Sequence, residues 1–481
     1  MQLNKIYAAI PDAHSLHPAD QREILGITAD SRQVKPGWLF VAERGVSVDG
    51  HTFIPKALAA GATAIVCETM PTDPDADVAW ITVPDSAVAL GHISACWYGY
   101  PSHSLTLVGV TGTNGKTTIA TLLYDMARLM GEKAGLLSTV VNRIDDTSVE
   151  ATHTTPDAIT IHALMRRMVD AGCTFCAMEV SSHAAHQHRI AGLEFNGAIF
   201  TNLTRDHLDY HKTVDNYIRA KKSFFDSLAP KAFALVNADD RNGEVMLQNC
   251  HARRLTYALH SHADFHARIL EHRLGGMLIS FDGTEVETQF TGDFNAYNLL
   301  AVYGASLLAG WDRDEVLRAL SRLTPVAGRC QTFQGGGVTA VVDYAHTPDA
   351  LANILSALSQ ACTGSIITVT GAGGDRDKGK RPLMAAEAAR RSRLVVLTSD
   401  NPRSEDPAVI AAEMRAGIPA DTSAEVVTIL DRAEAIRHAI AAARPGDVVL
   451  IAGKGHETYQ IIGSERHHFD DREIVREALA K

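Results

Sequence analysis

The segment GTNGKTT at 112–118 has residue types that suit a bound nucleoside triphosphate. Glycines allow backbone N–H groups to turn toward a phosphate, Lys116 can reach the β- and γ-phosphates, and the Thr117 hydroxyl can bind Mg²⁺. The general spacing of such loops asks for glycine where this chain has Val110. The apolar run at 104–110 and the helical apolar spacing at 119–130 place the segment between a strand and a helix. That context favours a nucleotide site over a glycine-rich turn without a ligand.

Two polar segments follow other apolar runs and add groups that could bind a metal ion. Glu179, in the run at 176–180, supplies a hard oxygen ligand of the kind that Mg²⁺ prefers, although a lone glutamate after a strand is more often solvated or a helix cap. The segment FTNLTRDHLDYH at 200–211 is too rich in polar residues to be explained by packing. Neighbouring histidines raise zinc as an alternative, but their spacing and oxygen-rich surroundings favour ordinary histidines. These histidines are His183, His186, His188 and His211.

Three charged motifs lie toward the C-terminus. They are GGDRDKGKR at 373–381, DNPR at 400–403 and GKGHE at 453–457. The last two directly follow apolar, strand-like runs at 393–399 and 447–452. Because functional turns of α/β sheets lie after the carboxyl ends of strands, we expect the three motifs to gather at one sheet edge.

Three α/β units are needed to position these motifs. The first hundred residues mix β-like runs at 38–42, 64–67 and 79–83 with a helix-like stretch at 54–60, and 99–102 has the composition of a linker. Further buried-strand candidates lie at 197–203 and 233–238, and after about residue 328 strand-like runs at 338–345, 365–371, 393–399 and 447–453 alternate with helical segments. We expect an α/β fold with a small N-terminal domain at 1–100, a central P-loop parallel-sheet ATPase domain at 101–327 and a C-terminal Rossmann-like domain at 328–481.

The composition excludes several classes of function. The formal net charge of -11 argues against a nucleic-acid partner, although a local basic pocket can still bind a small anion. Seven scattered cysteines indicate a reducing compartment, and the lone CxxC of Cys173 and Cys176 reads as buried small residues rather than a zinc or redox site. The N-terminus lacks a signal-peptide pattern, and no run of eighteen apolar residues occurs. We therefore expect a cytoplasmic protein with no membrane span, and a monomer.

The P-loop variant, Glu179 and the segment at 200–211 resemble the Mur ligases, and the P-loop also resembles their relative folylpolyglutamate synthase. The Mur resemblance implies ATP and two Mg²⁺ ions, with Thr117 and Glu179 holding one ion and His207 helping to hold the other. It also implies that the lysine four residues after Tyr217 is Lys221, carbamylated by CO₂ into a carboxylate-like metal ligand, whereas lysines on a helix are otherwise usually a solvated face. The catalytic residues implied are Lys116, Glu179, His207 and Lys221.

The same resemblance extends to the nucleotide contacts. GDFNAYNLLA at 292–301 matches a family segment whose second Asn faces the adenine, which is Asn298 here. Arg329 and Asp343 match residues that reach ATP from the mobile C-terminal domain, with Cys330 where the family usually has Met. The implied ATP-binding residues are Gly112, Thr113, Asn114, Gly115, Lys116, Thr117, Thr118, Asn298, Arg329 and Asp343.

The C-terminal motifs resemble the tripeptide-forming Mur ligases, which implies addition of meso-diaminopimelate to UDP-MurNAc-L-Ala-D-Glu. The far end of diaminopimelate is a zwitterion, so arginines suit its carboxylate and acids suit its ammonium. L-Lysine has no distal carboxylate and would make little use of Arg403. The implied diaminopimelate site is Arg376, Asp400, Asn401, Pro402, Arg403, Gly453 and Glu457. It assigns 328–481 to amino-acid binding and 1–100 to the UDP-sugar.

The nucleotide-sugar end carries a weaker resemblance. Asp30-Ser31-Arg32 and Asp49-Gly50-His51 resemble uridine-binding segments, and His153 stands where the family's N-T-T-P motif has Asn. The residues implied to hold the UDP-MurNAc-dipeptide are Ser31, Thr154, Thr155, Ser181, Gln187 and Arg189.

The implied reaction forms an amide bond through an acyl phosphate. The D-Glu γ-carboxylate would attack the γ-phosphate of ATP, and the amine of diaminopimelate would then attack the acyl carbon. The alternatives are an L-lysine-adding enzyme, another Mur or folylpolyglutamate-type ligase, a small-molecule kinase, and, from another class, a non-catalytic ATP-dependent switch.

Overall fold

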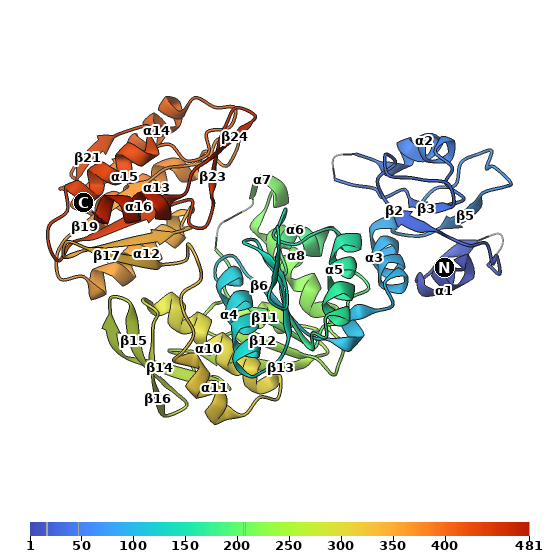
Figure 1. Ribbon diagram of the computed structural model, residues 1–481, viewed down its shortest axis with the longest axis horizontal. Coiled ribbons are helices and arrows are strands. Elements are labelled where there is room, and N and C mark those ends of the chain that lie inside the picture. The colour runs from blue at the N-terminus through green and yellow to red at the C-terminus, as the bar shows by residue number, and fades with distance from the viewer. Residues whose placement is uncertain (16–17, 47, 205, 207, 481) are drawn as a thin grey trace.

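The computed structural model describes residues 1–15, 18–46, 48–204, 206 and 208–480, which fold into three α/β units along the chain (Figure 1). Each unit has a sheet of its own, with five, eleven and six strands. The first unit's helix α3 (Ser86–Trp97) is followed by the first central strand, β6 (Thr106–Thr111). The last central helix, α11 (Arg313–Leu320), is followed by β17 (Gln331–Gly335) of the third unit. The boundaries expected at 100 and 327 stay predictions.

The N-terminal unit is a sheet with the strand order β1-β5-β4-β3-β2. Its four longer strands are parallel, and the short β1 pairs antiparallel with β5. Apolar side chains fill both faces, against α1 (Leu3–Ala9) and α3 on one side and α2 (Ile54–Ala59) on the other. The strands are β1 (His14–Ser15), β2 (Gly26–Thr28), β3 (Trp38–Val41), β4 (Ala64–Cys67) and β5 (Ala79–Thr82).

The central unit holds an eleven-stranded sheet with the order β16-β15-β14-β13-β12-β11-β6-β10-β7-β8-β9. The strands from β7 to β14 in this order pair in parallel, while β15–β16 and β8–β9 add antiparallel edges. The sheet is therefore mixed: its centre is the parallel sheet that was expected, and antiparallel strands extend both edges. Its strands are β6, β7 (Ala134–Leu137), β8 (Asn142–Ile144), β9 (Thr147–Val149), β10 (Phe175–Glu179), β11 (Gly197–Phe200), β12 (Phe233–Asn237), β13 (Arg253–Ala258), β14 (Phe265–Arg273), β15 (Gly276–Phe281) and β16 (Thr284–Thr288).

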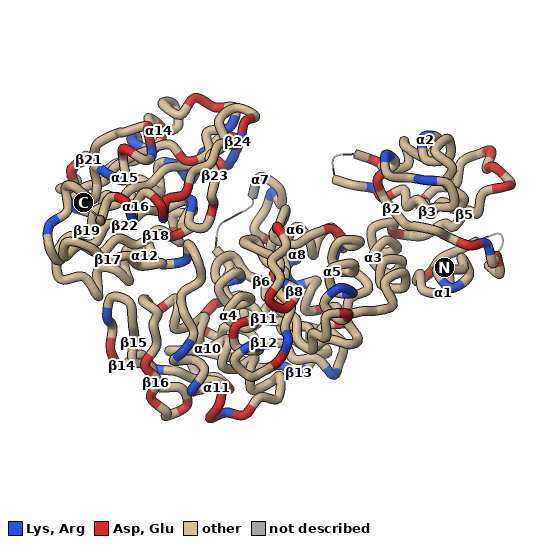
Figure 2. The backbone as a smooth tube through the Cα atoms, viewed as in Figure 1, with Lys and Arg blue, Asp and Glu red and all other residues tan. Residues whose placement is uncertain are grey.

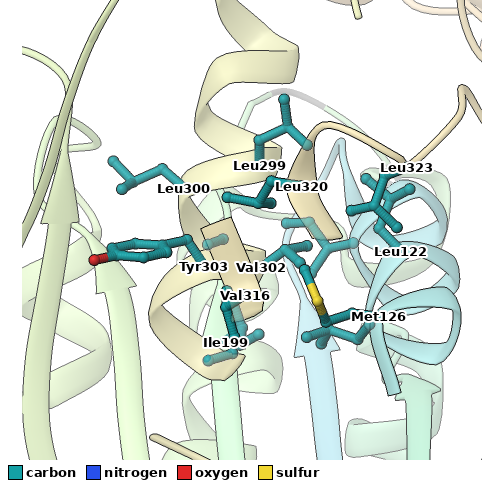
Figure 3. Packing of buried hydrophobic residues seen from close by; sticks show 14 of the residues in the cluster. Leu122, Met126, Ile199, Leu299, Leu300, Val302, Tyr303, Val316, Leu320 and Leu323 are labelled. Atoms are coloured by element: carbon teal, nitrogen blue, oxygen red, sulfur yellow. The ribbon is translucent and has the colours of Figure 1, made fainter. Parts of the chain in front are cut away.

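Helices cover both faces of this sheet. On one face, α4 (Lys116–Leu129), α10 (Asp293–Leu308) and α11 pack over the strands, and Figure 3 shows Met126, Val302 and Val316 from these helices meeting near Ile199 of β11. On the other face, α5 (Ala158–Asp170) and α8 (Val214–Asp226) bury a second apolar layer. The shorter helices are α6 (Ser182–His186), α7 (Leu208–His211) and α9 (Gly243–Leu247). The P-loop is thus held between a buried strand and a buried helix.

The C-terminal unit is a doubly covered sheet with the order β17-β18-β22-β19-β20-β21, parallel except for β17. Helices α12 (Pro348–Ala361), α13 (Lys380–Arg391) and α14 (Pro407–Arg415) cover one face, and α15 (Arg432–Ala441) and α16 (Asp471–Leu479) cover the other. This agrees with the Rossmann-like fold expected. The remaining strands are β18 (Val338–Asp343), β19 (Ile366–Thr370), β20 (Leu394–Leu397), β21 (Glu425–Thr428), β22 (Val448–Ala452), β23 (Tyr459–Ile462) and β24 (Glu465–His468).

Charged residues of both signs are interspersed over all three units (Figure 2). None of the helices in the described part of the chain is both long and apolar enough to cross a bilayer.

Candidate active site

The loop between β6 and α4 is shaped by two glycines that no other residue could replace without strain. Gly112 has a φ of +144°, and a Cβ there would lie 1.8 Å from Thr201 Oγ1. Gly115 has a φ of +91°, and a Cβ there would lie 2.6 Å from Asn298 Oδ1. Both positions need glycine because L side chains rarely adopt this backbone region. Lys116 begins α4, and its Nζ donates to the carbonyl oxygens of Gly112 and Thr113 at 3.0 and 2.9 Å.

The segment after β11 forms hydrogen bonds with this loop. The Asn114 N–H donates to Asn202 Oδ1 at 3.0 Å, and Thr201 Oγ1 donates to the Asn114 carbonyl at 2.6 Å. Thr113 Oγ1 lies 3.1 Å from the Tyr217 hydroxyl of α8. The segment after β11 and helix α8 therefore both hold the loop in one conformation.

A cavity of about 500 Å³ opens beside the loop. Its lining joins residues 113–118 to Glu179, to Asn298 of α10, and to Arg329 and Asp343 of the third unit. The Arg329 Nη2 atom donates to Thr117 Oγ1 at 3.1 Å, and its guanidinium stacks 4.4 Å from the Tyr344 ring centre. Burial raises the pKa of Asp343 despite Arg329 nearby. The structure thus brings together the residues for which the sequence predicted nucleotide contacts.

Glu179 ends β10 with its side chain fully buried at the floor of this cavity. Its Oε1 accepts a hydrogen bond from the Thr139 N–H at 2.7 Å, while Oε2 has no hydrogen-bond partner among the described residues. A buried carboxylate oxygen without a partner is costly unless a cation or water satisfies it. The residues therefore fit a Mg²⁺ ion held by Glu179 and the Thr117 hydroxyl. His207, the one histidine predicted as a metal ligand, lies outside the described residues.

The two adjacent lysines of α8 lie in different surroundings. Lys221 is 1% exposed, and its Nζ donates to the Gly112 carbonyl at 2.7 Å and lies 4.6 Å from the Tyr217 ring centre. Burial, followed by the nearby Lys116, lowers the pKa of Lys221 well below its usual value. Lys222 instead contacts Asp226 and the Gln248 carbonyl. Only Lys221 of this pair reaches the P-loop.

The histidines considered for zinc pack mainly against aromatic rings. The His183 and His186 ring centres lie 4.2 and 5.5 Å from that of Tyr210, and His211 Nε2 lies 2.9 Å from Ser182 Oγ. His188 Nε2 lies 3.7 Å from Asp85 of the first unit. No group of three or more His, Cys, Asp or Glu side chains arranged to hold a metal ion occurs within the part of the chain that the structure describes.

A second cavity, of about 1,020 Å³, lies between the central and third units. The three C-terminal charged motifs meet there, since β19, β20 and β22 end at its edge. Central-unit residues Thr154, His183 and Asp206 form part of the facing wall. Of the predicted diaminopimelate residues, the cavity is lined by Arg376, Asp400, Asn401, Arg403, Gly453 and Glu457. Pro402 is buried behind it, where its carbonyl closely approaches Gly374.

A buried lysine organises the acids of this cavity. Lys454 Nζ, with a fully buried side chain, donates to Asn401 Oδ1 and Glu457 Oε2, both at 3.0 Å. Burial raises the pKa of Asp400 by itself, but Lys454 and then Arg432 outweigh it, so this pKa is lower than usual. Burial and the negative charge of Asp400 raise the pKa of Glu457. One face of the cavity is therefore acidic.

The two predicted arginines of the cavity donate to backbone carbonyls of the GGDRDKGKR motif. Arg403 has a φ of +52°, and its Nη1 donates to the Gly374 carbonyl at 2.8 Å, which joins two of the motifs. Arg376 is exposed, and its Nη1 donates to the Asp375 carbonyl at 3.3 Å. Cationic and acidic groups thus line one cavity, as a zwitterionic ligand requires.

Five of the six residues predicted at the sugar-peptide end form one network beside β10. Thr155 Oγ1 donates to the Glu179 carbonyl at 2.8 Å and accepts from the Ser181 N–H at 3.1 Å. Arg189 donates to the Thr155 carbonyl and to Gln187 Oε1, and Thr154 Oγ1 accepts from Thr139. Ser31 lies after β2 in the N-terminal unit, and no hydrogen bond in the described part of the chain joins it to the other five.

The sequence reasoning assigned no role to several residues at or beside these cavities. Among them are His346 and Lys380, which line the larger cavity, and Lys454, which contacts the lining residues Asn401 and Glu457. Lys380 and Lys454 belong to the recognised motifs GGDRDKGKR and GKGHE, and His346 lies three residues after the predicted Asp343. Their position next to strand ends was therefore available as a signal, but their burial and partners were not.

Comparisons with known proteins agree with this arrangement. Family models described as "Mur ligase family, catalytic domain", "Mur ligase middle domain" and "Mur ligase, glutamate ligase domain" match residues 23–98, 110–306 and 328–455. The chain belongs to the Mur ligase family, which confirms the resemblance seen in its motifs.

Individual relatives show which members of the family the chain resembles. The chain is 56% identical, over 100% of its length and 99% of the relative, to the UDP-N-acetylmuramoyl-L-alanyl-D-glutamate–2,6-diaminopimelate ligase of Parabacteroides distasonis. A solved structure of a ligase of the same name has a TM-score of 0.71 at 34% identity, covering 100% of this chain and 99% of that one. A folylpolyglutamate synthase from Mycobacterium tuberculosis, covering 77% of this chain and 93% of its own, has a TM-score of 0.63 at 17% identity and so shares the fold alone.

Proposed function

We propose that the chain joins meso-diaminopimelate to UDP-MurNAc-L-Ala-D-Glu at the expense of ATP, in the synthesis of peptidoglycan precursors. The observation that carries this proposal is that the nucleotide cavity and the charged cavity share lining residues, among them Thr154, Asp206 and His346. An acyl phosphate formed in one cavity is thereby within reach of an amine bound in the other. The names and high identity of the relatives support the same reaction.

The first step transfers a phosphoryl group. A γ-carboxylate oxygen of the D-Glu residue attacks the γ-phosphorus of ATP, the bond to the β-phosphate oxygen breaks, and ADP leaves. Lys116 and the N–H groups of the P-loop neutralise charge on the phosphates, and Arg329 adds a cation from the third unit. Mg²⁺ held by Thr117 and Glu179 would supply further charge neutralisation and would orient the phosphates.

The second step forms the amide. The amine of diaminopimelate attacks the acyl carbon, a tetrahedral intermediate forms, and phosphate leaves with the electrons of the broken C–O bond. The acidic side of the larger cavity suits the ammonium of the distal zwitterion, and Arg403 with Arg376 suits its carboxylate. L-Lysine would leave these arginines without an anionic partner.

Lys221 is proposed as a carbamylated lysine. Its lowered pKa favours the neutral amine, which is the form that adds to the carbon of CO₂ with loss of a proton. The resulting carbamate would place a negative charge beside Gly112 and offset the positive charge of Lys116. This change would place an anion beside the buried Lys116 in place of a neutral amine, and the carbamate oxygens would be available as metal ligands.

We also propose that the protein acts as a cytoplasmic monomer. The P-loop and the arginine that contacts it come from one chain, so a second subunit is not needed to complete the nucleotide cavity. All seven cysteines are free thiols, as expected of a reducing compartment.

Phosphate release from ATP tests the proposal directly. The purified protein is given UDP-MurNAc-L-Ala-D-Glu with either meso-diaminopimelate or L-lysine. Release with diaminopimelate alone, together with a tripeptide product by mass spectrometry, is the expected result. Release with L-lysine alone would retain the ligase and overturn the assigned pocket, whereas nucleotide binding without product from folded protein would favour a switch.

A further inference from the structure

The amine that forms the new bond presents a chemical problem to this site. At neutral pH an amino acid carries its amino group as an ammonium, which has no lone pair and cannot attack the acyl carbon. A base is therefore required where the amino-acid cavity meets the nucleotide cavity. This question arises only within the proposed ligase reaction, on which the inference rests.

The described titratable residues that line both cavities are Asp206, Asp239, Asp240, Tyr344 and His346. Asp239 accepts hydrogen bonds from three backbone N–H groups and the Tyr297 hydroxyl, which together outweigh burial and hold its pKa far below the usual range. Asp240 accepts from the Leu203 and Asn242 N–H groups, so its lone pairs are engaged in the loop. Burial raises the pKa of Tyr344, which keeps its hydroxyl protonated.

His346 is held in an orientation that suits a base. It lies in the loop between β18 and α12, and its Nδ1 is 2.9 Å from the Tyr344 carbonyl. A carbonyl oxygen can only accept, so Nδ1 carries the proton and Nε2 carries the lone pair in the neutral ring. No hydrogen bond from His346 Nε2 to another residue occurs in the part of the chain that the structure describes.

The charges around the ring favour its neutral form. The groups that face His346 are Lys380 of α13, Asp206 after β11, Arg329 before β17, and Asp400 after β20. Burial, then Lys380, lowers the pKa of His346, with Asp206 opposing them. These influences together favour the uncharged ring, whose Nε2 can accept a proton. Asp206 is adjacent in sequence to His207, a predicted metal ligand. We therefore prefer His346 to Asp206 as the candidate base.

We propose that His346 is the catalytic base that accepts the proton of the incoming amine. One proton of the ammonium moves to His346 Nε2, and the freed nitrogen lone pair forms the N–C bond. The C–O bond to phosphate then breaks with its electron pair leaving on phosphate, and the departing phosphate takes the second N–H proton. The imidazolium then returns its proton to released phosphate or water. The first step, phosphorylation of the carboxylate, does not involve His346.

Hydroxylamine separates the two steps because it is largely neutral near pH 7 and attacks an acyl phosphate without a base. The His346→Asn variant retains a donor near the position of Nδ1 but has no basic nitrogen. We expect its tripeptide formation to fall by about 10²–10⁴-fold, while hydroxamate formation from UDP-MurNAc-L-Ala-D-Glu and ATP stays within about threefold of the unmodified protein. Imidazole should partly restore tripeptide formation to His346→Gly. The exposed His438 of α15 provides a control in His438→Asn, which should keep both activities.

Each contrary result has a distinct meaning. Tripeptide formation by His346→Asn at the original rate would overturn the base and leave only a structural role for the ring. An equal loss of hydroxamate and tripeptide, in a variant with unchanged melting temperature, would place His346 in the ATP step and also overturn the proposal. Absence of both products from the unmodified protein would instead overturn the proposed ligase function.

Discussion

Arg329 and Thr117 are joined by a 3.1 Å hydrogen bond although they belong to different units of the fold. The guanidinium of Arg329 therefore contacts the hydroxyl that the sequence assigns to Mg²⁺. The same guanidinium stacks on the ring of Tyr344. Through this contact, the position of the third unit depends on what is bound at the P-loop.

Replacing Arg329 should weaken the use of ATP. A hydrogen bond to a charged group contributes about 1.5–3 kcal/mol, which corresponds to about 10–100-fold. We expect kcat/KM for ATP to fall by at least about tenfold in Arg329→Ala, as measured by phosphate release at varied ATP. The exposed Arg390→Ala should behave like the unmodified protein, and an unchanged kcat/KM in Arg329→Ala would contradict the assignment.

Removal of the Lys116 ammonium should abolish turnover. Lys116 is the cation that the P-loop contributes, and α4 contains no second lysine that could replace it. Lys116→Ala should give no phosphate release above background, while the exposed Lys133→Ala should keep its activity. A Lys116→Ala enzyme that retains turnover and melts normally would show that the loop does not serve as the phosphate site.

Lys221 and Lys222 form a natural pair of test and control. Lys221→Ala should lose most activity because the carbamate would be missing, and added short carboxylic acids should restore part of it. Lys222→Ala, which only removes contacts to Asp226 and the Gln248 carbonyl, should stay active. Mass spectrometry under CO₂ should find the added carboxyl group on Lys221. Loss of activity without any rescue would count against carbamylation.

Arg403 should decide between the two amino acids. Arg403→Ala should raise KM for meso-diaminopimelate by about tenfold or more, since a charge-assisted contact to the distal carboxylate is lost. The low activity with L-lysine should change little, because lysine lacks that carboxylate. Steady-state kinetics with both amino acids measure the effect, and an equal change for the two would show that Arg403 acts on the fold of the motif instead.

Glu405 gives the C-terminal unit a pH-dependent contribution to stability. Two hydrogen bonds from the buried Arg381, at 3.0 and 2.8 Å, followed by the Asp375 N–H, lower the pKa of Glu405 from 4.5 to about 2. A lowered pKa in the folded state means that the contribution is complete above pH 4.5 and is lost as the pH falls toward 2. The gap in melting temperature between the unmodified protein and Glu405→Gln should therefore be widest near pH 7 and narrow below pH 4.5.

A control is needed because acid destabilises many groups at once. The exposed Glu434→Gln in α15 should give a small gap at every pH. A Glu405→Gln gap that stays constant down to pH 2 would show that the ion pair with Arg381 does not depend on ionisation of the glutamate.

The strands that carry the motifs could be predicted because they are fully buried. Residues 104–110, 176–180 and 447–453 are continuous apolar runs, and their polar residues therefore fall at strand ends, where functional turns lie. The antiparallel edge formed by β14, β15 and β16 was not predicted. Its strands alternate between buried and partly exposed residues, and Asp282 and Gly283 form a tight turn with φ values of +45° and +89°. That signal was present in the sequence, as an Asp-Gly pair between alternating segments.

The site was predictable in its residue types but not in its partners. Strand-end spacing places Asp400 and Glu457 near each other, but it does not reveal that Lys454 lies buried between Asn401 and Glu457. The tautomer of His346 depends likewise on the fold of its own loop. Such properties arise from tertiary contacts, which a linear pattern does not contain.

The order of the three units also matters while the chain is being made. Domains of a growing chain fold as units, beginning from the N-terminus. A nascent chain that has emerged only as far as α11 therefore has a formed P-loop but no Arg329 to contact it and no third unit to form the second cavity. Both cavities are complete only after the third unit has been translated and folded. We therefore expect unfinished chains on the ribosome not to hydrolyse ATP.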